Sequence, residues 1–171
     1  HQENIDDWAT HLLCLRDLQK KTGGITEFIP LPFVSMESPM YKRGHARPGP
    51  TFREVLLMHA IGRLSLHPLI QNIQSSWVKL GQLGALSCLN AGVNDMGGTL
   101  MNESISKAAG SIHGQEFTPE RMESFILSAN RKPLLRDTLY NEIDKDRIIY
   151  QSTISNSKNM QTLLDSAYPS Y

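Results

Sequence analysis

Apolar residues recur at helical spacing near the start of the chain and then give way to a short run rich in β-branched and aromatic residues. The spacing predicts a helix over residues 6–21, with acids at its start, bases at its end and an apolar face formed by Ile5, Trp8, Leu12 and Leu15. Two glycines stop this helix. The run over residues 25–34 predicts a strand that Pro30 and Pro32 break, as happens where a strand leaves a sheet.

The same two patterns alternate along most of the remaining chain. Thr51 and Glu54 form a capping box, which predicts a helix ending near Leu66. The elements after it are expected to be strand, helix, strand, helix and helix, over residues 69–78, 80–89, 93–96, 99–109 and from Thr118-Pro119-Glu120 onward. Alternating helices and strands with short turns are typical of βαβ units in a parallel sheet.

Such a sheet can be doubly wound or closed into a barrel. Strands of doubly wound sheets are almost continuously apolar, whereas residues 69–78 alternate apolar and polar positions. A polar face suits a barrel whose interior holds a substrate, so we favour an α/β fold with about three parallel βα units of a TIM-type (β/α) barrel, followed by C-terminal helices. We expect this domain to span residues 1–140, with a polar tail over residues 141–171.

Charge and composition narrow the classes of function. Seventeen Lys plus Arg balance seventeen Asp plus Glu, and a net charge of zero offers no field to attract nucleic acid or an anionic membrane. No apolar stretch approaches the roughly 20 residues of a membrane-spanning helix, which predicts a soluble protein of the cytoplasm or, in a eukaryote, of an organelle such as the chloroplast. The two cysteines, Cys14 and Cys88, lie in apolar helical sequence typical of a protein core and form no metal-binding motif.

The strand over residues 69–78 supplies the first candidates for ligand binding. Its alternation places Asn72, Gln74 and Ser76 on one face, opposite Ile73. Buried amides and hydroxyls need hydrogen-bond partners, so this face requires either an internal network or a polar ligand.

Two further candidates contain acidic or amide side chains near glycines. In the turn over residues 92–99, Asn94 and Asp95 precede a predicted helix, an arrangement that suits a polar ligand and equally a tight structural turn. Glu27 stands alone in an otherwise apolar strand, which indicates either a salt bridge or a functional carboxylate.

The loop over residues 35–50 is rich in Pro, Gly and Ser but also contains basic side chains. Arginine binds planar anions with two hydrogen bonds, so these residues either clamp a carboxylate or remain solvated: Arg43, His45 and Arg47.

Four distinctive blocks of sequence occur together and in order. They are Thr22-Gly-Gly-Ile-Thr-Glu-Phe-Ile-Pro-Leu-Pro-Phe-Val34, Ala46-Arg-Pro-Gly-Pro-Thr51, Asn72-Ile-Gln-Ser-Ser-Trp-Val-Lys-Leu-Gly81 and Gly92-Val-Asn-Asp-Met-Gly-Gly-Thr-Leu-Met-Asn-Glu103. These blocks resemble the FO synthase family of radical S-adenosylmethionine (SAM) enzymes, and the resemblance covers about residues 1–140.

The resemblance is to the tyrosine-using half of the enzyme, which is either a second subunit or the C-terminal half of a fused protein. It implies transfer of the 4-hydroxybenzyl group of L-tyrosine to 5-amino-6-(D-ribitylamino)uracil, on the route to the deazaflavin chromophore of coenzyme F420. In that family a CxxxCxxC loop binds a [4Fe–4S] cluster that cleaves SAM to a radical. The chain has no such loop, so we expect a C-terminal fragment that is inactive without the first subunit or a fused N-terminal half.

The resemblance also implies roles for individual residues. Glu3 and Glu27 are expected toward SAM. The expected lining of the substrate side is Asn72, Gln74, Ser76, Asn94, Asp95 and Asn102. No residue is assigned to a catalytic step or to a metal.

Two alternatives remain open at the level of sequence. The futalosine-pathway radical SAM enzymes of menaquinone synthesis share parts of the first and third blocks. A non-catalytic α/β module that binds a small ligand or a partner protein through its glycine-rich turn is the other reading.

Overall fold

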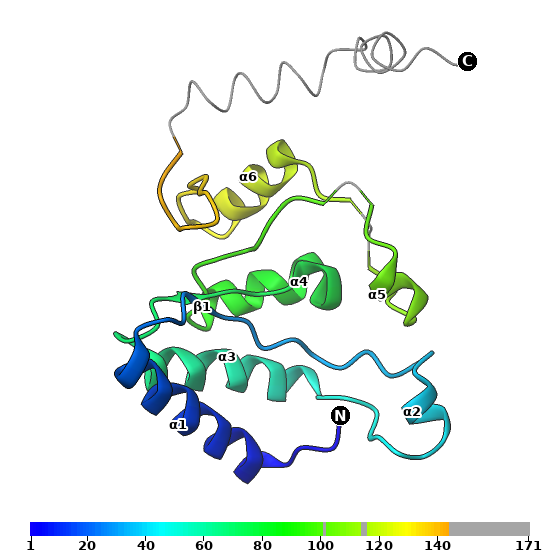
Figure 1. Ribbon diagram of the computed structural model, residues 1–171. Helices are drawn as coiled ribbons and strands as arrows, with labels where there is room; N and C mark the ends of the chain where they lie inside the picture. Colours follow the sequence, from blue (N-terminus) through cyan, green and yellow to red (C-terminus); the bar gives the residue numbers. More distant parts are fainter. Residues whose placement is uncertain (101, 114–115, 144–171) are drawn as a thin grey trace, which may run out of the picture. The chain divides into compact units, whose positions relative to one another are not determined.

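The computed structural model describes residues 1–100, 102–113 and 116–143, which fall into two compact units. The first unit runs from His1 to Lys132 and contains all the labelled helices and strands of Figure 1. The second begins at Pro133 and is described as far as Ile143. The boundary placed after residue 140 stays a prediction, and most of the predicted tail lies outside the described residues.

Helix α1, Ile5–Thr22, confirms the first predicted helix. The Asn4 side chain accepts hydrogen bonds from the backbone N–H groups of Asp6 and Asp7, and the Asp7 carboxylate accepts one from the Asn4 N–H. Gly23 ends the helix with a φ of 63°, in the left-handed region that favours glycine. Residues adjacent to α1 in the sequence therefore determine where this helix begins and ends.

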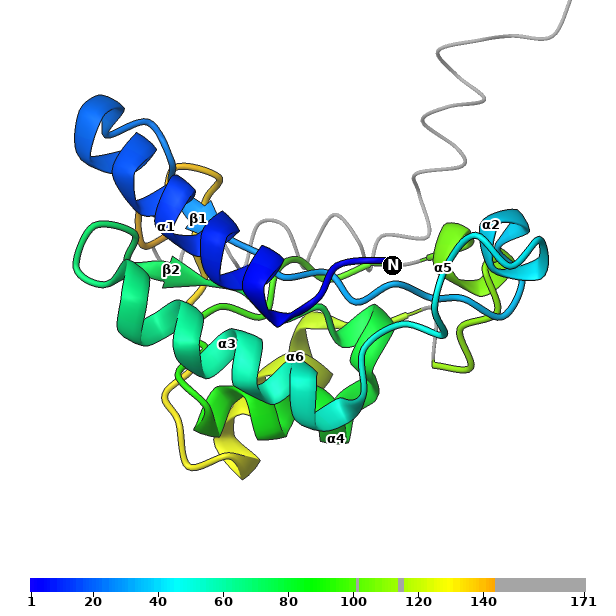
Figure 2. The same ribbon diagram turned by 90° about the horizontal axis from the view of Figure 1, so that it is seen from below.

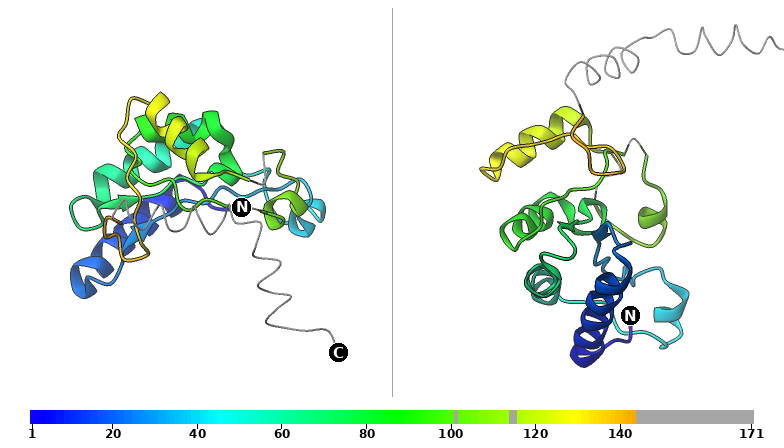
Figure 3. Two further views of the ribbon diagram at one scale, coloured as in Figure 1. Left: turned by 90° about the horizontal axis from the view of Figure 1, so that it is seen from above. Right: turned by 60° about the vertical axis from the view of Figure 1, so that its left-hand side comes forward.

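Helix α3, Phe52–Leu66, confirms the second predicted helix, including the capping box between Thr51 and Glu54. A short helix, α2 (Pro39–Lys42), lies in the loop that precedes it. Helix α3 packs between α1 and α4 (Trp77–Asn90), as Figures 2 and 3 show.

The sheet consists of β1 (Glu27–Phe28) and β2 (Asn72–Ile73), paired in parallel. A parallel bridge between Gln74 and Asp95 adds a third chain segment beside β2. The predicted order of these segments along the chain and their parallel direction are confirmed. The described residues thus form an α/β arrangement with a small parallel sheet, and no closed barrel is present among them.

The strands predicted over residues 25–34, 69–78 and 93–96 are too long, and this part of the prediction is wrong. Pro30 and Pro32 have no N–H group to donate, so regular pairing of the first strand stops after Phe28. The second strand ends because helix α4 already begins at Trp77 instead of residue 80. Only Asp95 of the third predicted strand takes part in a bridge.

The helix predicted over residues 99–109 is also wrong in its first half. Only α5, Ile105–Ala108, is helical. The preceding segment is held in an irregular path by contacts elsewhere: the Trp77 indole N–H donates to the Gly98 carbonyl, and the Phe117 N–H donates to the Leu100 carbonyl. The last predicted helix is confirmed as α6, Pro119–Ser128, capped by Thr118.

One face of the sheet carries the core. Phe28 and Ile73 are buried there, and Gly62 of α3 lies so close that a Cβ atom on it would come within 2.9 Å of the Phe28 ring. The Trp77 ring packs edge-on against Phe117, with ring centroids 5.2 Å apart. Helices therefore cover this face and leave the opposite face of the sheet for polar side chains.

The described part of the second unit is a tight turn. Arg136 and Glu142 form an antiparallel bridge, and the Arg136 guanidinium lies 4.0 Å from the centre of the Tyr140 ring. The Asp137 carboxylate accepts hydrogen bonds from the backbone N–H groups of Leu139 and Asn141.

Candidate functional site

Four polar side chains share the face of the sheet opposite the core. Parallel partners in register point to the same side, so Glu27 lies beside Asn72, and Gln74 beside Asp95. Asn72 and Gln74 are two residues apart on one strand and share this face as well. We call the row of Glu27, Asn72, Gln74 and Asp95 the polar stripe.

Local contacts fix the geometry of the polar stripe. The Asn72 amide donates to the Thr26 carbonyl at 2.9 Å, and an Asp95 carboxylate oxygen accepts from the Gly97 N–H at 2.6 Å. Gly97 has a φ of 71°, and a Cβ atom on it would lie 2.5 Å from the Gln74 amide nitrogen. A glycine is therefore required at residue 97 for Gln74 and the turn to lie this close.

Asn94 contacts the opposite side of the strand from Asp95. Its side-chain oxygen accepts from the Ile73 backbone N–H at 2.9 Å and from the Arg63 guanidinium at 2.6 Å. The same guanidinium donates to the carbonyls of Gly92 and Gln71, at 2.7 and 2.8 Å. The two hydrogen bonds of the Asn94 oxygen therefore hold together β2, α3 and the segment that contains Asp95.

The remaining two residues expected on the substrate side lie away from the regular strands. Ser76 is the half-buried residue just before α4, and its side chain makes no capping hydrogen bond to that helix. Asn102 is exposed in the irregular segment before α5.

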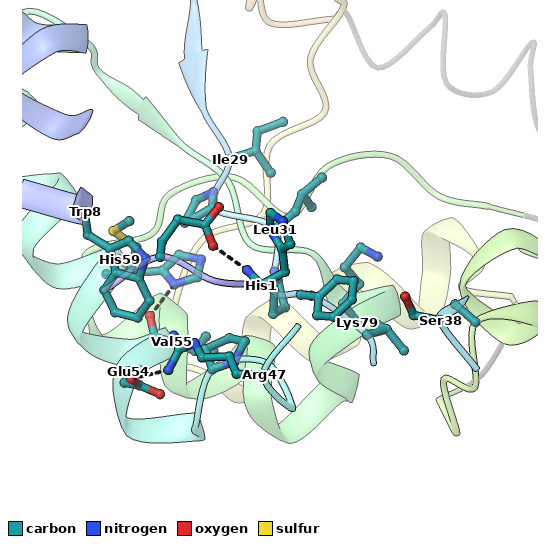
Figure 4. A pocket seen from close by; sticks show the side chains of 18 of the residues that line it. His1, Trp8, Ile29, Leu31, Ser38, Arg47, Glu54, Val55, His59 and Lys79 are labelled. Atoms are coloured by element: carbon teal, nitrogen blue, oxygen red, sulfur yellow. Dashed lines mark hydrogen bonds and ion pairs between the residues drawn. The ribbon is translucent and has the colours of Figure 1, made fainter. Parts of the chain in front are cut away.

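A cavity of about 1010 Å³ opens beside β1, between the start of α1, the segment that follows β1 and the first turns of α3. Figure 4 shows it from close by. Of the residues predicted for a site, only Glu3 and the loop residue Arg47 line it, and the polar stripe does not. Trp8 and Lys79 also line the cavity, and the sequence patterns did not select them for a site.

Arg47 is held firmly at the cavity wall. Its guanidinium forms an ion pair with Glu54 at 3.1 Å and lies 5.5 Å from the centre of the Trp8 ring. Hydrogen bonds from the Thr51 backbone and side chain, with a smaller contribution from Arg47, lower the pKa of Glu54. The carboxyl group is therefore ionised at neutral pH and anchors Arg47 at the cavity wall.

Glu3 accepts hydrogen bonds from the terminal ammonium group of His1 and from the Gln2 backbone N–H. The first of these contacts is the main reason why the pKa of Glu3 falls to about 2. In a longer polypeptide the same nitrogen would be a peptide N–H, without the positive charge.

A group of polar side chains is buried between β2, α3 and α4. The His59 Nδ1 atom lies 2.8 Å from the Val55 carbonyl and 3.8 Å from the Cys88 sulfur. Burial lowers the pKa of His59 and raises the pKa of Cys88, so both are neutral at pH 7. Cys88 is a core residue as predicted, whereas Cys14 is exposed on α1 and its predicted place in the core is wrong.

Neither cysteine belongs to a metal-binding group. In residues 1–100, 102–113 and 116–143, no set of three or more His, Cys, Asp and Glu side chains is arranged to hold a metal ion. No helix of this part of the chain is both long and apolar enough to cross a membrane.

Comparison with known proteins shows the family of this chain. Residues 22–149 match the family model described as CofH/MqnC C-terminal region, and the chain belongs to that family. The chain is 48% identical over 143 residues to 5-amino-6-(D-ribitylamino)uracil–L-tyrosine 4-hydroxyphenyl transferase of Methanopyrus kandleri, covering 84% of this chain and 39% of that protein. The resemblance drawn from the four sequence blocks is thereby confirmed.

FO synthases are similar over the same region. The chain is 46% identical over 145 residues to FO synthase of Nocardia farcinica and 45% identical over 147 residues to FO synthase of Streptomyces coelicolor. These matches cover 85% and 86% of this chain and 17% of each relative. The chain therefore spans well under half the length of the curated relatives it matches.

Proposed function

We propose that this chain is the substrate-side part of a radical SAM transferase that joins the 4-hydroxybenzyl group of L-tyrosine to 5-amino-6-(D-ribitylamino)uracil during FO and coenzyme F420 biosynthesis. The polar stripe carries this proposal, because it places amides and carboxylates on the face of a parallel sheet opposite the core. The 48% identity to a transferase named for these two substrates supports the choice of reaction.

The stripe would face the interior of a (β/α) barrel that the longer parent protein completes. Helices cover the other face of the sheet, as they do on the outside of such barrels. In the described residues, β1 pairs with β2 on one side only. A strand from another part of that longer protein would pair with its other edge.

The [4Fe–4S] cluster and the cleavage of SAM belong to the upstream half in this proposal. Three thiolates on one loop hold such a cluster, and the residues of this chain do not fit it, since Cys14 is exposed and Cys88 is buried beside His59. Glu3 and Glu27 would face SAM from this side.

Within the stripe, Asn72, Gln74 and Asp95 would bind the uracil. A carboxamide both donates and accepts hydrogen bonds, as does the imide edge of a uracil ring. Ser76 and Asn102 would extend this surface around the same substrate. We propose that Asn94 positions these residues through its contacts with Ile73 and Arg63, although the family likeness suggested a direct contact with substrate.

The test is anaerobic turnover by the complete protein that carries this chain, with its cluster reconstituted. Supplied with SAM, L-tyrosine and 5-amino-6-(D-ribitylamino)uracil, it should form the 4-hydroxybenzyl adduct detected by mass spectrometry. Finding no adduct would refute the proposal. Turnover of a futalosine-pathway substrate in its place would assign the chain to those relatives, and ligand binding without any turnover would favour a non-catalytic module.

A further inference from the structure

The cavity beside β1 has an aromatic and proline-rich wall. Trp8, Phe28 and Phe33 line it, together with residues 29–32, which lie between the two phenylalanines in the sequence. The Phe33 ring is tilted by 59° against the His1 ring, with centroids 5.8 Å apart. Rings of this kind pack well against another flat aromatic group. Figure 4 shows Trp8, Leu31 and Lys79 around the opening.

Most charged groups of the cavity already have partners of opposite charge or hydrogen-bond donors. Glu54 pairs with Arg47, and Glu37 pairs with Lys42. The carboxylate of Asp7 accepts the hydrogen bond that caps α1. These acids are thus neutralised or bonded by the protein itself.

Lys79 differs from Arg47, the arginine of the cavity. It is half-buried, yet no carboxylate of the described residues lies within ion-pair distance of its ammonium group. A partly buried cation beside apolar walls is stabilised by an anion that enters with the ligand.

The position of Lys79 relates the cavity to the polar stripe. Its backbone N–H donates to the Ser76 carbonyl at 3.2 Å, in the first turn after β2. Gly81 has a φ of 68° and a ψ of 176°, which separates this turn from the rest of α4. The residue thus stands at the carboxyl end of the strand that contributes Asn72 and Gln74, where α/β proteins bind their ligands.

We propose that Lys79 binds the α-carboxylate of an aromatic amino acid whose ring lies against the aromatic wall of this cavity. This inference rests on the proposed function for the identity of the amino acid, L-tyrosine. The uracil substrate has no carboxylate, so the cavity would take the amino acid while the polar stripe takes the uracil. SAM carries the same carboxylate chemistry and is the competing source.

Calorimetric binding to the complete protein tests the inference without requiring turnover. The probes are L-tyrosine and tyramine, which differ only in the carboxylate. The unmodified protein should bind tyrosine about 10-fold or more tightly than tyramine, because a charge-assisted hydrogen bond is lost with the carboxylate. Lys79→Met should bind both equally within about 2-fold, whereas Lys79→Arg should keep most of the preference.

Lys20→Met is the matched control, because Lys20 is exposed on α1 and, among the residues that the structure describes, its ammonium group pairs with Asp17. It should leave both affinities unchanged. An unchanged preference for tyrosine in Lys79→Met, with a melting temperature like that of the control, would overturn the inference. The inference would also be overturned if Lys79→Met weakened the affinity for SAM and left the affinity for tyrosine unchanged. If binding depends on the carboxylate but the turnover assay gives no adduct, the proposed function is refuted and the role of Lys79 is not.

Discussion

Replacing Asn94 by Ala removes the acceptor that joins three elements of the fold. Its oxygen accepts from the Ile73 N–H at 2.9 Å and from Arg63 at 2.6 Å. Ile73 is fully buried, so its N–H would lose its partner where water has little access. The substitution therefore acts on the backbone of β2, the strand that carries Asn72 and Gln74.

The size of the effect follows from these two contacts. An unsatisfied buried N–H costs about 1–3 kcal/mol, and an exposed charged contact such as that of Arg63 contributes on the order of 0.5 kcal/mol. We therefore expect Asn94→Ala to lower the free energy of unfolding by about 2–3 kcal/mol. In a chain of this size that corresponds to a fall in melting temperature of about 5–10 °C.

Guanidinium denaturation followed by far-UV circular dichroism measures this difference. Asn90→Ala is the control, because Asn90 is exposed at the end of α4 and its replacement should change stability by less than about 0.5 kcal/mol. If Asn94→Ala is as stable as the control but binds substrate poorly, Asn94 contacts the ligand and our account of its role is refuted.

Three further predictions concern single positions. Gly97→Ala should displace Gln74 and cost about 1–3 kcal/mol in the denaturation assay, since φ is 71° and the Cβ meets the amide. Gly81→Ala should lower the melting temperature, because its Cβ would lie 2.6 Å from the His113 ring at a φ of 68°. Burial lowers the pKa of His59 below 6.5, so stability should fall as pH drops below 6.5, and His59→Gln should flatten this part of a denaturation–pH profile.

The sequence predicted the helices well where capping signals and periodicity agreed. Thr51 and Thr118 each precede a helix and bond to its first turn. Such contacts span only a few residues, so the local sequence contains all the information needed. The lengths of the strands were not predictable in the same way, because pairing also depends on the neighbouring segment.

The candidate site was likewise predictable only where the local sequence determines the position of a side chain. Alternation along β2 was enough to place Asn72 and Gln74 on one face and Ile73 on the other. Neither periodicity nor glycine spacing distinguished Asn94 from Asp95, whose side chains make separate sets of contacts. Lys79 was missed because its cavity is assembled from segments distant in sequence, for which no local pattern exists.

We propose that the polar stripe binds the uracil substrate of a radical SAM transferase. The most direct measurement is anaerobic adduct formation by the complete protein with Gln74→Ala, beside Gln82→Ala as a control at an exposed glutamine of α4. We predict that Gln82→Ala forms the 4-hydroxybenzyl adduct normally. Gln74→Ala should raise the KM for 5-amino-6-(D-ribitylamino)uracil by about 10-fold, as for the loss of one well-placed hydrogen bond. An unaltered KM in Gln74→Ala, or no adduct from the unmodified protein, would refute this role of the polar stripe.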